Sequence, residues 1–308
     1  MDLAISQAEL PVSAFHTKRA YIPQLRQLAF VDHVARESGL AEMALTLGPN
    51  ASITEYGIFG DYVTSPETFG GALRLTTAMM SYHSSFDRMS LVPLDDDIKF
   101  NYHAAVRHAI GYRHYAILAI CVLSTIALPY FGRKDVAKRI EFDFARPPDC
   151  DAFETFFKCA IHFDKPSLCL VYGRDQLSQR RLAEPHRTVS ISDVVRDAMN
   201  PAPREVFGAV EALVRLGIED GDTSLNSIAC QLDCGERTLR RRLDAFGISY
   251  RDLVLKTRID RARELLTQTK LPVTQIAMEV GYSDNAHFTR AFRGLTGMSP
   301  REARRIRK

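Results

Sequence analysis

Side chains that can recognise base pairs gather in two segments of the C-terminal third of the chain. The first segment contains Arg237, Arg240, Arg241 and Asp244, and the second contains Asn285, His287, Thr289, Arg290 and Arg293. An arginine can donate two hydrogen bonds to O6 and N7 of guanine, and an asparagine can bind adenine in the same two-point manner. The alternative is that these side chains are solvated or bind phosphates, because half or more of protein–DNA hydrogen bonds go to the DNA backbone.

An apolar stripe in each segment predicts the helix that positions these side chains. The stripes consist of Leu239, Leu243 and Phe246 in the first segment and of Phe288, Phe292 and Leu295 in the second. The spacing i, i+4, i+7 places each stripe on one face of an α-helix that packs against its neighbours. Because successive residues rotate by about 100°, the polar side chains point outward. Arg242 lies nearer the packed edge, where a phosphate contact or a salt bridge is expected.

A short helix and a turn precede each stripe, so the same unit occurs twice. Ile228 leads to a turn at 233–235, and Ile276 leads to a turn at 281–283. A glycine in each turn permits the tight bend between two helices. Residues before the turn correspond at an offset of 48 and residues after it at 49, so the second turn is one residue longer. Two consecutive helix-turn-helix units indicate double-stranded DNA as the partner.

A third helix is expected between the two units. Apolar residues recur at helical spacing from Tyr250 to about Thr269, and Pro272 ends this segment and begins the next unit. Twenty residues of helix span about 30 Å. This length is close to the roughly 34 Å between successive major grooves on one face of B-DNA. A stiff helix would therefore let one chain place both recognition helices in successive grooves.

Two stretches carry a family resemblance, GYSDNAHFTRAFRGLTGMSP and ERTLRRRLDAFGISYRDLVLKTRIDRARELL. Through them, residues 204–304 resemble the DNA-binding domain of the AraC/XylS family of bacterial transcription regulators. Three positions depart from the family pattern, because Gly235 replaces a serine helix cap, Leu295 a frequent tryptophan and Ala303 a tyrosine. The resemblance implies a sequence-specific regulator, an activator that binds promoter DNA and touches RNA polymerase.

Length and composition indicate two domains without a membrane anchor. The chain has 308 residues, of which 46% are hydrophobic, and a net charge of +3. From Ala202 onward, 19 Lys and Arg oppose 14 Asp and Glu, a basic surplus that suits a polyanion. The N-terminus lacks the pattern of a secretory signal. The longest uncharged run, Tyr115–Phe131, is too short for a bilayer and is expected to be a buried helix. We therefore expect a cytoplasmic protein with no membrane partner.

No cofactor, metal site or catalytic site is expected. The six cysteines follow no zinc or disulfide spacing, and Cys230 and Cys234 have no matching His or Cys pair. Reduced thiols are the default in a cytoplasm. The sequence has no nucleophile elbow, no Gly-rich phosphate loop and no His-x-x-x-His pair, so we do not expect an enzyme.

The N-terminal two thirds mix helical and strand patterns. After a loose arm at 1–18, helices are expected at Pro23–Ser38, at Met43–Leu47 and from a Ser65 cap to about His83. Strands are expected at 90–94, 98–104, 139–145, 161–163 and 168–172, with helices at 112–128 and 150–158. Helices followed by ββαβαββ indicate an α+β sensor domain rather than an all-β barrel.

Three further stretches, FGDYVTSPETFGGALR, IEFDFARPPDCDAFETFF and IHFDKPSLCLVYGRDQL, carry a second resemblance. They make residues 20–178 similar to the N-terminal domain of one branch of the same family, which includes ornithine-utilisation and virulence regulators. This resemblance implies effector sensing or dimerisation and leaves the effector open.

A dense group of aromatic and imidazole side chains suggests where an effector could bind. The group consists of Tyr82, His83, Tyr102, His103, Tyr112 and Tyr115. A pocket needs apolar walls with a few directed polar groups. The alternative is that these side chains lie at the solvated edge of a sheet and on a helix surface, because aromatic clusters usually contribute to packing.

These patterns predict three parts. They are an α+β effector-sensing and dimerisation domain at 1–183, a linker at 184–203, and an all-α domain with two helix-turn-helix motifs joined by a linker helix at 204–308. An apolar patch at Val189–Val195 is either a dimer-contact helix or a spacer, and Gly217 is expected to end the helix that contains Val206.

The leading hypothesis is a homodimeric transcription regulator controlled by a small-molecule effector. One alternative is an effector-independent regulator whose N-terminal domain only dimerises. Another is a small-molecule-binding or enzymatic domain tethered to DNA.

Overall fold

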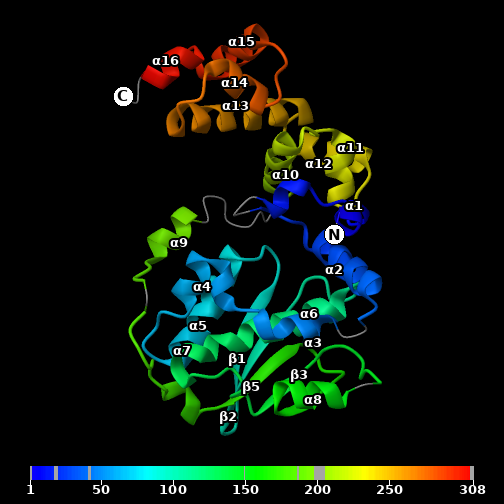
Figure 1. The fold of residues 1–308 in the computed structure, drawn as a ribbon, viewed down its shortest axis with the longest axis vertical. Coiled ribbons are helices and arrows are strands. Elements are labelled where there is room, and N and C mark those ends of the chain that lie inside the picture. The colour runs from blue at the N-terminus through cyan, green and yellow to red at the C-terminus, as the bar shows by residue number, and fades with distance from the viewer. Residues whose placement is uncertain are drawn as a thin grey trace. The chain divides into compact units, whose positions relative to one another are not determined.

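The computed structural model describes residues 2–16, 20–40, 43–148, 150–185, 187–197 and 205–305. The chain forms two compact units, whose helices and strands are labelled in Figure 1. The helical unit is Met1–Gln27 together with Pro203–Lys308, and the α/β unit is Leu28–Ala202. The division after Ala202 lies one residue from the boundary expected at 203/204. The first 27 residues group with the C-terminal helices, whereas the sequence pattern assigns them to the N-terminal domain.

The α/β unit follows the order that the sequence predicts. Its helices and strands are α2 (Gln24–Ser38, which the division after Gln27 crosses), α3 (Met43–Leu47), α4 (Ile58–Val63), α5 (Phe69–Met79), β1 (Arg88–Leu94), β2 (Asp97–His103), α6 (Tyr112–Ser124), α7 (Leu128–Phe131), β3 (Arg139–Glu141), α8 (Asp151–Phe157), β4 (Ala160–His162), β5 (Leu168–Gly173) and α9 (Ile191–Asp197). The α+β class is therefore confirmed, although β3 covers only the first part of the strand expected at 139–145.

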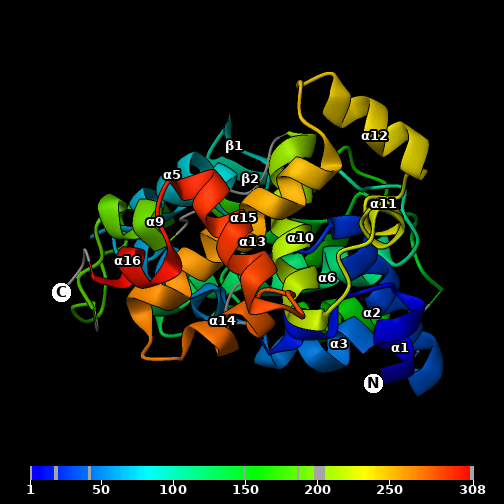
Figure 2. The ribbon, with the colours of Figure 1, turned by 90° about the horizontal axis from the view of Figure 1, so that it is seen from above.

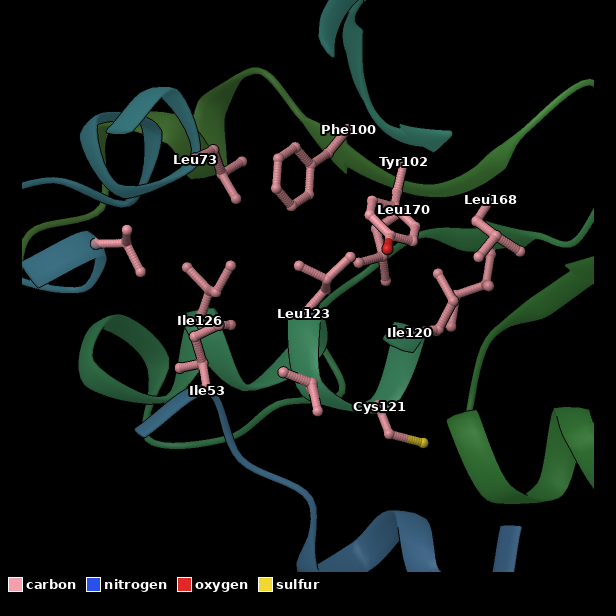
Figure 3. Packing of buried hydrophobic residues seen from close by; sticks show 14 of the residues in the cluster. Ile53, Leu73, Phe100, Tyr102, Ile120, Cys121, Leu123, Ile126, Leu168 and Leu170 are labelled. Atoms are coloured by element: carbon pink, nitrogen blue, oxygen red, sulfur yellow. The ribbon is translucent and has the colours of Figure 1, made fainter. Parts of the chain in front are cut away.

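The sheet has five strands in the order β1-β2-β5-β3-β4, and only β3 and β4 pair in parallel. Every residue of the central strand β5 is buried. Helices α5 and α6 contact the sheet through β1 and β5. From α6, Ile120 and Leu123 point toward Phe100 and Leu170 of the strands (Figure 3). The core of the unit therefore lies between these helices and the sheet.

The apolar run expected as a buried helix lies in this core. By length and composition, 112–131 is the one helical stretch among the described residues that could cross a membrane, with a mean hydropathy of 1.7. Ile117, Ile120 and Ile126 are completely buried against the rest of the unit. The run is thus a core element, because its apolar side chains are covered by protein.

Two details of the α/β unit differ from the sequence prediction. The cap of α5 is Thr68 rather than Ser65, because Thr68 has the extended backbone of a cap and its Oγ1 accepts from the amide of Gly71 at 3.2 Å. The helix ends at Met79, and a short 3₁₀ turn follows at Met80–Tyr82.

The patch at Val189–Val195 belongs to the α/β core. Val189 and Val194 are buried, and α9 packs against α4. The patch is therefore no simple spacer, although Ile191 and Val195 remain about half exposed.

The helical unit contains no strand among its described residues, which confirms the all-α prediction. Its helices are α1 (Asp2–Gln7), α10 (Val206–Asp220), α11 (Leu225–Gln231), α12 (Glu236–Asp244), α13 (Tyr250–Gln268), α14 (Val273–Glu279), α15 (Asn285–Thr296) and α16 (Pro300–Arg305), with a 3₁₀ turn at Val12–Phe15. Helix α13 packs against α10 and also against α14, α15 and α16 (Figure 1; Figure 2). It is the element to which both helix-turn-helix units are attached.

The N-terminal segment is not the loose arm that the sequence suggests. Ile5, Ala8 and Leu10 are buried, and the amide of Ser13 donates to Asp220 Oδ1 at 2.9 Å. Residues 1, 17 and 18 of the expected arm lie outside the described residues. The expectation was wrong because the 3₁₀ turn at Val12–Phe15 packs against α10, a partner some 200 residues away that no local pattern reveals.

Helix α10 also continues past its expected end. Gly221, with φ = 79°, forms the C-cap instead of Gly217. Gly217 lies inside the helix, where a Cβ would meet the carbonyl oxygen of Asp222 at 2.2 Å. This glycine therefore permits a close approach of the backbone and does not end the helix.

Candidate nucleic-acid interface

Both recognition helices are held by the first two residues of their apolar stripes. Leu239 and Leu243 of α12 are completely buried, as are Phe288 and Phe292 of α15. The third residue of each stripe differs from the prediction, since Phe246 is 50% exposed and Leu295 is 46% exposed. The reason is position: α12 ends at Asp244, so Phe246 lies in the following turn, and Leu295 lies in the last turn of α15.

The opposite faces of the two helices carry the side chains predicted to contact DNA. The exposed members of this set are Arg237, Arg240, Arg241, Asp244, Asn285, His287, Arg290 and Arg293. Thr289 is only half exposed, and its hydroxyl donates to the carbonyl of Asn285 at 2.8 Å. The ring of His287 contacts that of Tyr282, with 5.5 Å between centroids. The structure therefore groups these residues on two outward helix faces, and their contact with DNA stays a prediction.

The arginines on these faces form no ion pair with the part of the chain that the structure describes. Among the described residues, no carboxylate lies within ion-pair distance of Arg237, Arg240, Arg241, Arg242, Arg290 or Arg293. A guanidinium without a partner is available to a phosphate or a base.

The cations on α10 and α13 are arranged differently. Lys256 lies 2.9 Å from Glu211, Arg261 lies 3.2 Å from Glu219, and Arg215 pairs with Glu264. These carboxylates neutralise three cations of the helices to which the two units are attached. Among the described residues, the arginines of α12 and α15 have no such ion pairs.

The two recognition helices begin differently. Asp284 caps α15 by accepting hydrogen bonds from the amides of Ala286 and His287, both at 3.0 Å, and these amides lower the pKa of its carboxyl group. Gly235 stands at the same place before α12 and provides no side-chain cap, as its sequence position indicated. Asp284 was missed, although an aspartate directly before a helix is a recognised start signal.

A second residue that sequence reasoning missed is Arg258 on α13. Its guanidinium donates to the carbonyl of Gly281 at 3.3 Å and to Thr223 Oγ1 at 3.0 Å. It also lies over the ring of Tyr282, 5.7 Å from the centroid. Arg258 therefore fastens the linker helix to the second turn, at the glycine whose φ is 82°.

The linker helix has the length expected of it. Helix α13 contains 19 residues, which corresponds to about 28 Å at 1.5 Å per residue. Pro272 caps the following helix α14, as predicted.

The predicted effector cluster is only partly assembled in the α/β unit. Tyr102 donates to Asp87 Oδ2 at 2.6 Å and lies 2.5 Å from the hydroxyl of Tyr115. Burial and these neighbours raise the pKa of the Tyr102 hydroxyl. Tyr112 donates to Asp143 at 2.9 Å. These hydroxyls are thus engaged within the protein.

The other members of the cluster have different surroundings. His83 lies against the rings of Tyr56 and Phe59, at centroid distances of 4.2 and 5.2 Å. Tyr82 packs against the core, and His103 is exposed at the end of β2.

Comparison with known proteins identifies the architecture. Residues 228–306 match the family model of a helix-turn-helix domain, and residues 2–196 match that of the arabinose-binding domain of AraC transcription regulator, N-terminal. The second match alone spans more than half of the chain. The chain belongs to the AraC family of transcription regulators. The family resemblance and its DNA-binding, non-enzymatic function are therefore confirmed.

Several AraC-family regulators are similar along most of their length. HTH-type transcriptional regulator VqsM of Pseudomonas aeruginosa is 27% identical over 84% of this chain and 82% of its own length. The ornithine utilization regulator of the same organism is 25% identical over 86% and 79%. VirS of Mycobacterium tuberculosis is 38% identical over 56% and 51%. The solved structure of CdpR from P. aeruginosa covers 85% of this chain and is itself covered to 86%, at 22% identity and a TM-score of 0.40.

Proposed function

We propose that this AraC-family regulator is an effector-controlled activator whose helices α12 and α15 enter two successive major grooves. The observation that carries the proposal is the contrast in charge pairing. Arginines on the recognition helices lack partners among the described residues, whereas Lys256, Arg261 and Arg215 on the framework are neutralised. Phosphate neutralisation supplies much of the affinity of such proteins, so unpaired arginines on these two helices favour DNA as their partner.

Within this interface, we assign base contacts to the centres of the two outward faces. Arg241 and Arg290 are exposed at the middle of α12 and α15, where a guanidinium can reach guanine O6 and N7. Asn285 is placed to read adenine at the start of α15. Arg242 and Arg293 contact phosphates, which position the helices without reading sequence.

The test compares arginines on the two kinds of helix. The probe is a DNA duplex selected by the full-length protein from a random-sequence pool. Arg241→Ala and Arg290→Ala should each weaken binding by about 1–3 kcal/mol in a gel-shift titration. Arg263→Ala is the matched control, because Arg263 is exposed on α13 and lies 3.9 Å from Asp260. Unchanged binding of both test variants would contradict the proposal.

The activator acts as a cytoplasmic homodimer that contacts RNA polymerase, and its effector binds in the α/β unit. Support for the effector comes from the match to an arabinose-binding domain, which concerns the domain type and not this chain's own ligand. A thermal-shift screen of metabolites against the full chain tests this part. Failure of every metabolite to raise the Tm would favour the effector-independent alternative. Sedimentation velocity and a promoter reporter test dimerisation and activation.

A further inference from the structure

We infer that a cavity in the α/β unit binds a compact apolar carboxylate, which is the effector required by the proposed function. The cavity has a volume of about 440 Å³. Sites for small molecules commonly measure about 300–1,000 Å³. The cavity lies among α6, α7, α8, the chain at 49–52 and the chain at 133–137, so all of its walls belong to one unit.

The inner wall is apolar. It is formed by Ala51, Cys121, Ala137, Ile140, Phe156 and Phe157. Figure 3 shows why the site lies here: Ile120 and Leu123 on α6 point toward the strands, while Cys121 points away from them. The helix therefore uses one face for the core of the unit and another to line the cavity.

The polar groups in this wall need no ligand. Ser124 donates its hydroxyl to the carbonyl of Ile120 at 2.7 Å. Thr125 donates to the carbonyl of Val122 at 2.6 Å and accepts from the amide of Ile53 at 2.9 Å. Burial raises the pKa of the Cys121 thiol to about 12, which keeps it uncharged at neutral pH. A sugar or another polyhydroxylated molecule would form few hydrogen bonds with this wall. An apolar group needs no hydrogen bonds and can be buried there without this cost.

The rim is positive. Arg133, Lys134 and Lys158 line it together with one carboxylate, that of Asp135. Lys158 lies 3.3 Å from Asp135 and is neutralised by it. Lys134 lies 3.4 Å from the carbonyls of Gly48 and Pro49, and Arg133 is exposed without an ion pair among the described residues. One unpaired guanidinium with a lysine beside it matches a single carboxylate head group, which arginine binds through two parallel hydrogen bonds.

The tyrosine-rich cluster is a weaker candidate for the same ligand. The hydroxyls of Tyr102 and Tyr112 already donate to Asp87 and Asp143. Asp143 also pairs with Arg107 at 3.3 Å, so the polar groups of this cluster are engaged within the protein. The cavity beside α6 has cations at its rim and an apolar interior, so the ligand is placed there.

Isothermal titration of the full-length protein with three probes tests the inference. The probes are 4-phenylbutanoate, 4-phenylbutan-1-ol and 4-phenylbutylamine, which share one body and differ only in charge. The carboxylate should bind at least about tenfold more tightly than the alcohol, and the amine should bind most weakly. Equal binding of the three probes, or no binding of the carboxylate, would overturn the inference.

Three variants locate the binding site. Ala137→Phe should abolish binding because it fills the cavity, and Arg133→Gln should reduce the preference for the carboxylate over the alcohol to about twofold or less. Arg88→Gln is the matched control, because Arg88 is an exposed arginine on β1 away from the cavity. Arg133 lies on the surface, so its variant keeps the test valid even if Ala137→Phe does not fold. Unchanged carboxylate binding in Arg133→Gln would overturn the inference.

The outcome of this test is independent of the outcome of the test of the proposed function. All three variants should bind the selected DNA duplex like the wild type when no ligand is present. A metabolite of another charge class that raises the Tm would overturn the carboxylate assignment but leave an effector-controlled regulator. Only the variants of α12 and α15 test sequence-specific DNA binding.

Discussion

The two helix-turn-helix units have the same layout but differ in what stabilises them. In the first unit, α12 has nine residues, an aliphatic core of Leu239 and Leu243, and no side-chain cap. In the second, α15 has twelve residues, an aromatic core of Phe288 and Phe292, and the Asp284 cap. The arginines are distributed in the opposite sense, since α12 carries four and α15 carries two, although Glu236 and Asp244 give α12 the same net charge of +2 as α15.

The two copies of the motif therefore differ in what they contribute to DNA binding and to helix stability. The first unit offers more arginines for phosphate contacts, whereas the second unit has the longer recognition helix and the side-chain cap. Arg258 on α13 contacts both units, because it donates to Thr223 before α11 and to Gly281 in the turn of the second unit, where it also lies over the ring of Tyr282. Four experiments test this difference between the two units.

The largest expected effect comes from truncating the two cores. Phe292→Ala should lower the free energy of unfolding of the helical unit by about 3–5 kcal/mol, and Leu243→Ala by an amount toward the lower end of about 2–5 kcal/mol. Both side chains are completely buried, and the phenylalanine leaves the larger cavity. Hydrogen exchange of the full chain measures the loss in α12 and α15 separately. Leu295→Ala, at an exposed position of α15, serves as control, and a greater loss in Leu243→Ala would contradict the comparison.

The next effect concerns the salt dependence of DNA binding. Replacing Arg237, Arg240 and Arg242 together by Gln should flatten the plot of log affinity against log salt by about 0.9 for each lost phosphate contact. Arg293→Gln should flatten it by at most one such step. Fluorescence anisotropy with the selected duplex at several salt concentrations measures both slopes. Equal slopes for the two variants would refute the assignment of most phosphate attraction to the first unit.

A smaller effect is expected from the cap of α15 and from its dependence on pH. The amides of Ala286 and His287 hold the pKa of Asp284 below its usual 3.8, so the cap stabilises the helix above that pH and is lost as the pH falls through the lowered value. Asp284→Ala should therefore have a lower Tm at pH 7, and its Tm should fall less than that of the wild type between pH 5 and pH 3. Ser283→Ala, which leaves the cap intact, should behave like the wild type in the same thermal melts.

The smallest effect is expected from adding a helix cap to α12 in the first unit. Gly235→Ser should raise the stability of α12 by a few tenths of a kcal/mol, because serine supplies the missing acceptor. Gly235 has extended backbone angles of −76° and 149°, and an added Cβ would meet no atom within 4 Å. Gly235→Ala lacks the acceptor and should give no gain, so equal stabilisation by both changes would argue against a capping effect.

Much of this architecture could be predicted from local patterns. The i, i+4 spacing of Leu239 with Leu243 and of Phe288 with Phe292 fixed which face of each recognition helix is buried. Alternation likewise located the strands β1 and β2. These features depend on periodicity over a few residues, which the sequence displays directly.

What could not be predicted depends on distant partners. The position of the turn at Val12–Phe15 depends on α10, and the exposure of Phe246 depends on where α12 stops. The cavity beside Cys121 arises from five segments that come together only in the folded chain. Arg258 was missed for the same reason, since its partners lie 23 and 35 residues away.

The central claim is that one chain reads two successive major grooves, one with each recognition helix. Methylation interference on the selected duplex tests it most directly, because a methyl group at guanine N7 blocks a contact in the major groove. For each bound chain we predict two clusters of interference about one helical turn apart, roughly 10–10.5 base pairs. Arg241→Ala should erase one cluster, and Arg290→Ala should erase the other. A single cluster, or loss of the same cluster in both variants, would contradict the account.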